Sequence, residues 1–190
     1  MFGIVGVSDG LAFSDNPCLV TEYTWAAGAP RPASFYMNTA DPGAQSVHWT
    51  APGPKPCSGA SSDAGCAYNY GWNAASHAFS YADAQTGVAA RSAWWLDIET
   101  ANTWSSTTAL NSADIHGMVD FFTGRSVTVG IYSTGFQWNQ ITGGLTLGVP
   151  NWLASASSTI ALATTRRSIS DVPSSRRGLV AFGVRYAWPA

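Results

Sequence analysis

Short apolar runs alternate with helical patterns along most of this chain. The apolar runs predict five buried strands, at residues 2–7, 33–38, 93–96, 126–132 and 149–154. Helical patterns lie between successive strands, at about 17–27, at about 72–86, at 107–123 and from residue 136 onward. Strands that alternate with helices are typical of a parallel sheet with helical crossovers, so we expect an α/β fold.

Capping residues mark the ends of three predicted helices. Asn16 stands at an N-cap position, Pro17 at the first helical position, and Gly28 just past the helix end. Gly87 and Gly124 follow the last residues of the next two helices. These signals give boundaries for the helices that the apolar pattern alone does not fix.

The strand at 93–96 ends in a pair of acids, within the run W-W-L-D-I-E-T from Trp94 to Thr100. Asp97 and Glu99 are two residues apart, so they share one face of the strand, with Cα atoms roughly 6.5–7 Å apart. Two carboxylates at the end of an apolar strand cost solvation energy, and acid/base chemistry at a sugar acetal carbon is a common use for such a pair. The alternative is that both acids only cap the strand or face solvent.

Polar and aromatic residues follow the other predicted strands. Asp9, Asn38, Tyr132 and Trp152 lie at or near strand ends, as Glu99 does. Because the carboxyl ends of parallel strands meet at one edge of a sheet, these side chains are expected to converge on one cleft. Asn38 and Asp9 are candidates for hydrogen bonds to sugar hydroxyls, and each is equally compatible with a turn.

The segment 39–70 is rich in Pro, Gly and Ser and shows no periodicity. A disulfide between Cys57 and Cys66 would close a loop of about ten residues and tie this segment down. Such a bond indicates an oxidising, extracytoplasmic compartment, with Cys18 left over. The alternative is three reduced thiols in a cytoplasmic protein. The three His are scattered, and the two Cys lack zinc-ligand spacing, so we expect no metal site.

The composition fits one domain with a sizeable core. The 190 residues are 46% hydrophobic and 11% charged, and no uninterrupted apolar run reaches 18 residues, so no membrane span is expected. The net charge of −2 gives no electrostatic drive toward nucleic acid or anionic lipid.

The last part of the chain differs in character. Five Arg and one acid stand in 166–190, and no helical or strand period is visible there. We expect a domain over 1–158 and an atypical Arg-rich segment over 159–190. The ratio of eight Arg to one Lys is typical of a high-GC bacterial gene. The segment is either a basic tail or the product of a frameshift in such a gene.

The series of motifs along 1–158 resembles a known group of proteins. In order, these motifs are F-G-I-V-G-V, N-P-C, R-P-A-S-F-Y-M-N-T-A-D-P-G, Y-G-W-N-A-A, W-W-L-D-I-E-T and V-G-I-Y-S-T-G-F-Q-W. The chain is similar to the glycoside hydrolase family 25-like (lysozyme-like) domains of secreted actinobacterial proteins. The resemblance implies a (β/α)8 TIM barrel, a secreted or cell-wall location, a monomer and no cofactor.

The resemblance also implies a substrate and a set of site residues. The family cleaves the β-1,4 bond between N-acetylmuramic acid and N-acetylglucosamine in peptidoglycan, and the Glu of its D-x-E motif, here Glu99, is the proton donor. Asp97 would stabilise positive charge at the sugar or position its N-acetyl group. Tyr132 with Trp138, and also Trp152, match aromatic positions of the sugar cleft. Trp95 is a further stacking candidate, although Trp94 or Trp95 must face the core.

Two departures from the family pattern bear on activity. The family's first strand, with its D-V-S-like motif, has no match, and the last stretch, L-V-A-F-G-V-R-Y-A-W-P-A, has no acid where the final strand carries one. We therefore expect an incomplete barrel and a chain that is a fragment.

The expected mechanism places the raised pKa on Glu99, through its apolar neighbours and the Asp97 charge. The rivals are a non-catalytic module that binds cell-wall carbohydrate and an inactive fragment of such a hydrolase. Binding of glycan without new reducing ends would separate the first rival from an enzyme.

Overall fold

A computed structural model describes residues 2–153 of the chain. The five strands are β1 (Ile4–Gly6), β2 (Ser34–Asn38), β3 (Trp94–Asp97), β4 (Val129–Ser133) and β5 (Asn151–Leu153). The four α-helices are α1 (Leu19–Ala27), α2 (Ala64–Thr86), α3 (Thr108–Thr123) and α4 (Gly135–Thr142). Two short 3-10 helices, Gly43–Gln45 and Ala89–Arg91, lie in the connections.

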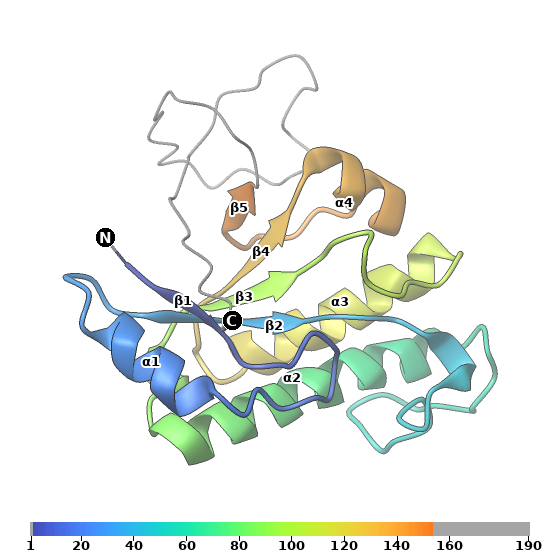
Figure 1. Cartoon of the computed structure of the whole chain (residues 1–190). Helices are drawn as coiled ribbons and strands as arrows, with labels where there is room; N and C mark the ends of the chain where they lie inside the picture. The colour runs from blue at the N-terminus through green and yellow to red at the C-terminus, as the bar shows by residue number, and fades with distance from the viewer. Residues whose placement is uncertain (1, 154–190) are drawn as a thin grey trace.

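The strands form one parallel sheet in the order β1-β2-β3-β4-β5, and one helix connects each pair of neighbours. When the strand order follows the chain and the crossovers share one hand, the connecting helices fall on the same face of the sheet. Figure 1 shows α1, α2 and α3 side by side beneath the strands. Side chains of all four helices join strand residues in one core. The predicted α/β fold with a parallel sheet is confirmed.

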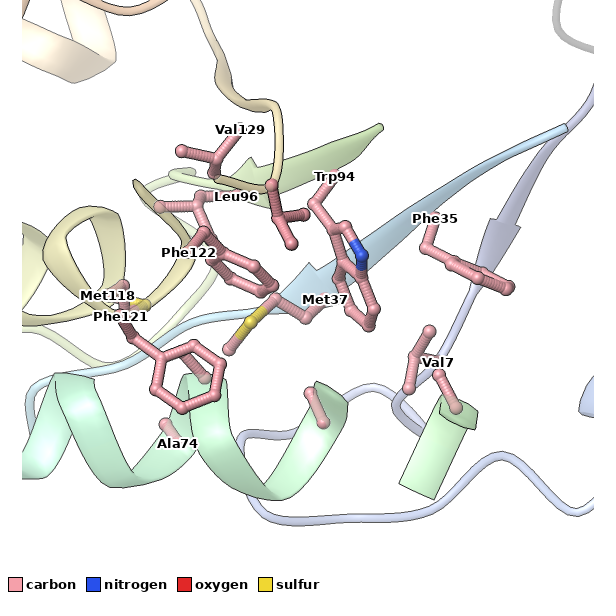
Figure 2. Packing of buried hydrophobic residues seen from close by; sticks show 14 of the residues in the cluster. Val7, Phe35, Met37, Ala74, Trp94, Leu96, Met118, Phe121, Phe122 and Val129 are labelled. Atoms are coloured by element: carbon pink, nitrogen blue, oxygen red, sulfur yellow. The ribbon is translucent and has the colours of Figure 1, made fainter. Parts of the chain in front are cut away.

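The core lies between this helix-covered face and the helices. Trp94, Leu96 and Ile98 alternate along β3 and its extension, and each is fully buried. Figure 2 shows Trp94, Leu96 and Met37 reaching from the strands toward Phe121 and Phe122 of α3. Burial of large apolar side chains of this kind contributes about 1.5–3 kcal/mol each, so this layer is the main source of stability. The opposite side chains of β3 point to the face without helices, called the non-helical face below.

Helices α2 and α3 pack backbone to backbone. A Cβ atom at Gly117 would lie 2.0 Å from the carbonyl oxygen of Tyr68, and one at Gly71 would lie 2.0 Å from the carbonyl oxygen of Asp114. Only glycine fits at either position. The close contact fixes both helices against the sheet, and α3 leads into β4, which carries Tyr132.

The segment before α2 is tied down by the predicted disulfide. Cys57 and Cys66 are bonded, and Trp49 packs against Cys66 in a small second cluster. The prediction that α2 begins near residue 72 is wrong, because the helix begins eight residues earlier, at Ala64, where Asp63 caps it by accepting from the Gly65 and Cys66 N–H groups. Its first turns lack the apolar stripe that the sequence pattern detects.

Helix α1 begins at Leu19, and its N-cap position is Cys18 rather than Asn16. Asn16 still acts locally, since its side chain accepts from the Cys18 N–H. Cys18 is exposed and unpaired among residues 2–153. Within the same range, no helix is long and apolar enough to cross a membrane.

Candidate active site

A row of polar and aromatic residues crosses the non-helical face at the carboxyl ends of four strands. Asn38 of β2 pairs in register with Asp97 of β3, and Asp97 pairs with Tyr132 of β4. Tyr132 in turn pairs with Trp152 of β5. Residues in register on neighbouring strands point to the same face, so the structure brings together four of the predicted site residues in one line.

Two aromatic rings lie on the same face, two residues closer to the amino ends of β2 and β3 than this row. Tyr36, in register with Trp95, lies over Gly6, where a Cβ atom would be 2.8 Å from the Tyr36 hydroxyl oxygen. The Trp95 indole lies over Gly130, where a Cβ atom would be 2.6 Å from its Cζ3 atom. The two glycines therefore leave room for the Tyr36 and Trp95 rings, which pack next to the polar row.

Asp97 is the central member of the row and is only 8% exposed. Its Oδ2 atom accepts a 2.9 Å hydrogen bond from Asn38 Nδ2. Its Oδ1 atom is buried and has no hydrogen-bond partner within residues 2–153. Thr39 Oγ1 and Asn102 Nδ2 both donate to the Asp97 backbone carbonyl, at 2.6 and 2.8 Å. The backbone is thus clamped while one carboxyl oxygen is left unused.

The environment of Asp97 changes its protonation. Burial raises the pKa of Asp97 to about 7, and the nearby Glu99 charge acts in the same direction. The neighbouring side-chain amides of Asn102 and Asn38 favour the ionised form and work against this rise. The sequence analysis predicted a raised pKa for Glu99, and the structure shows a raised pKa for its buried neighbour Asp97.

Glu99 lies two residues beyond Asp97, where the chain leaves the strand, and is half-buried. Its backbone carbonyl accepts from Trp104 Nε1 at 2.8 Å and from the Asn102 N–H at 3.1 Å. These contacts fix the Glu99 backbone and do not use its carboxylate. The pair therefore combines a buried carboxyl that holds a proton near neutral pH with a more accessible one.

Three aromatic side chains gather beside the acids. Trp152 contacts Tyr132, with ring centroids 4.6 Å apart, and Trp95, with centroids 5.7 Å apart. All three are partly exposed. Trp138 does not join them: it is 1% exposed, belongs to the core, and donates through Nε1 to the Leu145 carbonyl. Its predicted contact with sugar is replaced by core packing, because α4 turns this side chain toward the helix-covered face.

Asp9 lies in the turn after β1 and is exposed. Its backbone N–H donates to Ser14. The neighbouring Ser8 is the residue that connects this turn to the row, since its hydroxyl accepts from the Asn38 N–H at 2.9 Å. The structure thus places Asp9 at the same edge of the sheet but shows no contact between Asp9 and the row.

Sequence reasoning missed the residues that hold Asp97 in place. Thr39 and Asn102 act through the Asp97 carbonyl, and Ser133 Oγ donates to the Ile98 carbonyl at 2.7 Å. Thr39 and Ser133 stand at the ends of strands, which was the available signal. Among residues 2–153, no three His, Cys, Asp or Glu side chains are arranged to hold a metal ion.

The sheet thus carries a carboxyl pair and partly exposed aromatic side chains at its strand ends, groups that carbohydrate-active proteins use. The model of the lysozyme-like protein 1 family matches residues 71–172, just over half of the chain. The chain therefore belongs to the lysozyme-like protein 1 family. This membership suggests a cell-wall glycan hydrolase-like function. No curated protein and no solved structure matches the chain.

Proposed function

We propose that this protein hydrolyses the β-1,4 bond between N-acetylmuramic acid and N-acetylglucosamine in peptidoglycan. The observation that carries the proposal is the pair formed by Asp97, the last residue of β3, and Glu99, two residues beyond it, with a pKa of Asp97 of about 7. A pair of carboxyls that keeps one proton near neutral pH has what general acid catalysis at a glycosidic oxygen requires.

Glu99 is the proton donor in the proposed mechanism because it is the more accessible carboxyl. A glycan lying over Glu99 removes water from it and favours its protonated form, so the proton of the pair passes to Glu99. Asp97, hydrogen-bonded by Asn38, is then the ionised partner.

Glu99 gives its proton to the glycosidic oxygen as the bond from that oxygen to the anomeric carbon breaks. The Asp97 carboxylate stabilises the positive charge that develops on the sugar. Water then adds to the anomeric carbon, and its released proton returns to the carboxylate pair. The leaving sugar departs with a free hydroxyl, and a new reducing end forms.

Trp95, Tyr132 and Trp152 are proposed to bind the glycan next to the acids. Asn38 is assigned a positioning role, since its amide is already engaged with Asp97. Asp9 is kept as a candidate for a sugar hydroxyl at the edge of the site, because its exposed side chain lies next to the Ser8–Asn38 connection.

The wider context is also a proposal. We propose a (β/α)8 barrel of the glycoside hydrolase family 25 type. The proposal is supported by the five parallel strands, which follow the chain order and have helices on one face, as in such a barrel. The Cys57–Cys66 disulfide supports a secreted or cell-wall protein. We propose an actinobacterial origin, a monomer, a domain over 1–158 and a separate Arg-rich segment over 159–190, which lies outside the described residues.

A non-catalytic module that binds cell-wall carbohydrate is the second candidate. It is favoured by the cluster of Trp95, Tyr132 and Trp152, since partly exposed rings are enough to bind a sugar without the acids.

Release of reducing ends from purified peptidoglycan tests the proposal. The wild-type chain should generate reducing ends, and Glu99→Gln should lower the rate by about 100- to 10,000-fold while it still binds insoluble peptidoglycan. Asp83→Asn is the matched control, because Asp83 is an exposed carboxyl on α2.

Two outcomes would decide against catalysis by this pair. Equal rates for the wild type and Glu99→Gln would remove Glu99 from the mechanism. Saturable binding by the wild type with no reducing ends would favour the binding module.

A further inference from the structure

Two acids away from the candidate active site carry buried oxygens that no protein group satisfies. Asp114 on α3 and Asp41, three residues after β2, are both 0% exposed. Both carboxyl oxygens of Asp114, and Oδ2 of Asp41, have no hydrogen-bond partner within residues 2–153. Asp41 Oδ1 accepts from the Gly43 N–H at 3.1 Å. A buried carboxyl oxygen is costly unless something pairs with it, so these three oxygens call for a partner.

The two acids and a buried tyrosine form one cluster. The Asp41 charge acts on Asp114, and the charges of both acids act on the Tyr70 hydroxyl, so the three groups lie near one another. Tyr70 is on α2 and is 4% exposed. Asp114 is held at the α2–α3 contact, where a Cβ atom at Gly71 would lie 2.7 Å from Asp114 Oδ1. The Asp41–Tyr70–Asp114 cluster therefore joins the β2–α2 connection to both helices.

The cluster has the chemistry of a site for a hard cation. All three side chains present oxygen, the ligand atom that Ca²⁺ and Mg²⁺ take, whereas Zn²⁺ is bound mainly by Cys and His. The expectation of no metal site came from the spacing of His and Cys, which does not bear on oxygen ligands. One divalent cation balances two carboxylates and removes the repulsion between them. Mg²⁺ usually keeps several of its waters, so a fully buried cluster favours Ca²⁺.

We propose that Asp41, Asp114 and the Tyr70 hydroxyl bind one Ca²⁺ ion at the junction of the β2–α2 connection, α2 and α3. Asp114 contributes both carboxyl oxygens, Asp41 contributes Oδ2, and Tyr70 contributes a neutral oxygen. Without calcium the two acids hold protons instead, because burial raises the pKa of each. Calcium replaces these protons when it binds, so its affinity rises with pH.

The position of the cluster indicates what the ion does. The Asp41 N–H donates to the Thr103 carbonyl at 2.9 Å, which joins the connections that follow β2 and β3. Thr39 and Asn102, from the same two connections, donate to the Asp97 backbone carbonyl. A cation bound to Asp41 therefore has a structural role, because it supports the two segments that clamp Asp97. Stability is the property that reports its binding most directly.

Thermal unfolding of the full chain, stripped of metal with EDTA and desalted, tests the site at about pH 7.5. Calcium chloride at about 100 times its Kd should raise the melting temperature by about 5–10 °C, because a ligand that binds only the folded state stabilises it. Magnesium chloride at the same concentration should give a smaller rise. At about pH 5 the calcium effect should shrink, since protons compete for the acids. Calorimetric titration with calcium chloride should give about one ion per chain, as the single cluster requires.

Two variants of the cluster and two controls locate the ion. Asp114→Asn keeps the size of the side chain but removes its charge, so the calcium-dependent rise in melting temperature should disappear. Asp41→Asn should have the same effect and serves if Asp114→Asn does not fold. Asp97→Asn should keep the rise, because the acid pair is not the proposed site. Asp83→Asn, at an exposed position on α2, should also keep it.

Four results would overturn the inference. The first is a wild type that shows no calcium binding by calorimetry, whatever the variants do. The second is an equal calcium effect in the wild type and Asp114→Asn. The third is an effect lost in Asp97→Asn and kept in Asp114→Asn, which would assign the ion to the acid pair. The fourth is an equal response to magnesium, which would remove the selectivity for calcium. None of these measurements uses hydrolysis, so they stand apart from the proposed function.

Discussion

At the scale of single residues, burial decides what each acid of this protein does. Asp97 ends β3 and Glu99 lies two residues beyond it, yet only Asp97 is almost fully covered. The same register that buries Asp97 places Asn38 beside it, and the Asn38 amide, together with that of Asn102, favours the ionised form. The protonation of the pair is therefore a property of the β2–β3 register as much as of the D-x-E sequence.

Removal of the Asn38 amide should move the alkaline limit of activity. Loss of the hydrogen bond to Asp97 Oδ2 destabilises the ionised form, so the pKa of Asp97 rises above about 7 in Asn38→Ala. The proposed mechanism needs one proton on the pair, and this proton is lost as the pH rises through that pKa. The alkaline limb of the kcat/KM profile on peptidoglycan should shift to higher pH.

Asn73→Ala provides the comparison, because the Asn73 amide donates to the Pro52 carbonyl, away from the acids. Its profile should coincide with that of the wild type. An alkaline limb that stays in place in Asn38→Ala would mean that Asp97 does not hold the proton that limits activity.

At the scale of elements, the α2–α3 contact determines how the sheet is covered. Glycines on both helices allow the backbones to approach, and the apolar side chains of α3 then reach β3 and β4. Strand β3, which ends at Asp97, is held by this layer, so the contact between the two helices also supports the site.

Gly117→Ala should destabilise the fold strongly. Its Cβ atom would lie 2.0 Å from the Tyr68 carbonyl oxygen and 2.9 Å from the Trp72 nitrogen, both backbone atoms. The two helices must move apart, at a cost of about 1–3 kcal/mol or more. Denaturant unfolding measures this loss. Gly135→Ala, with no atom within 4 Å of its Cβ position, is the matched control and should change stability little. Equal stabilities of the two variants would contradict the close helix contact.

Periodicity predicted the strands and helices well, because each buried element carries an apolar stripe with the right period. It failed at the start of α2, where small residues and the Asp63 cap replace that stripe. The site was predicted in outline, since Asn38, Asp97, Tyr132 and Trp152 stand at strand ends. Sequence could not show that Trp138 faces the core or that Asp97 carries the raised pKa, because both depend on how elements pack.

At the scale of the whole molecule, buried acids oppose folding at neutral pH. Asp114 on α3 is fully buried, both of its carboxyl oxygens lack a partner among residues 2–153, and burial raises its pKa well above the usual range. The nearby Asp41 charge adds to this rise, and burial also raises the pKa of Asp41 itself. With Asp97, three acids favour the protonated form in the folded chain. Asp63, the α2 cap, has a pKa lowered to about 2 by its hydrogen bonds with Ser58.

These shifts predict the direction of the pH dependence of stability. In the unfolded chain an Asp loses its proton near pH 4, whereas Asp41, Asp97 and Asp114 keep theirs to higher pH in the folded chain. Between these values the folded state binds more protons, so stability falls as the pH rises above about 4. The pKa of Asp63 is shifted in the opposite direction, so ionised Asp63 stabilises the folded chain at neutral pH. This contribution is lost only as the pH falls from about 4 toward 2.

The melting temperature of the wild type should therefore be lower at pH 8 than at pH 4.5. A pKa shift of one unit corresponds to about 1.4 kcal/mol, and 1 kcal/mol moves the melting temperature by about 2–4 °C for a protein of this size. Asp114→Asn should flatten the dependence, because an amide does not ionise and its Nδ2 group can donate to unpaired acid oxygens nearby. Asp83→Asn, on the exposed face of α2, should retain the slope of the wild type. If Asp114→Asn also retained that slope, the buried Asp114 would not be the acid that links folding to pH.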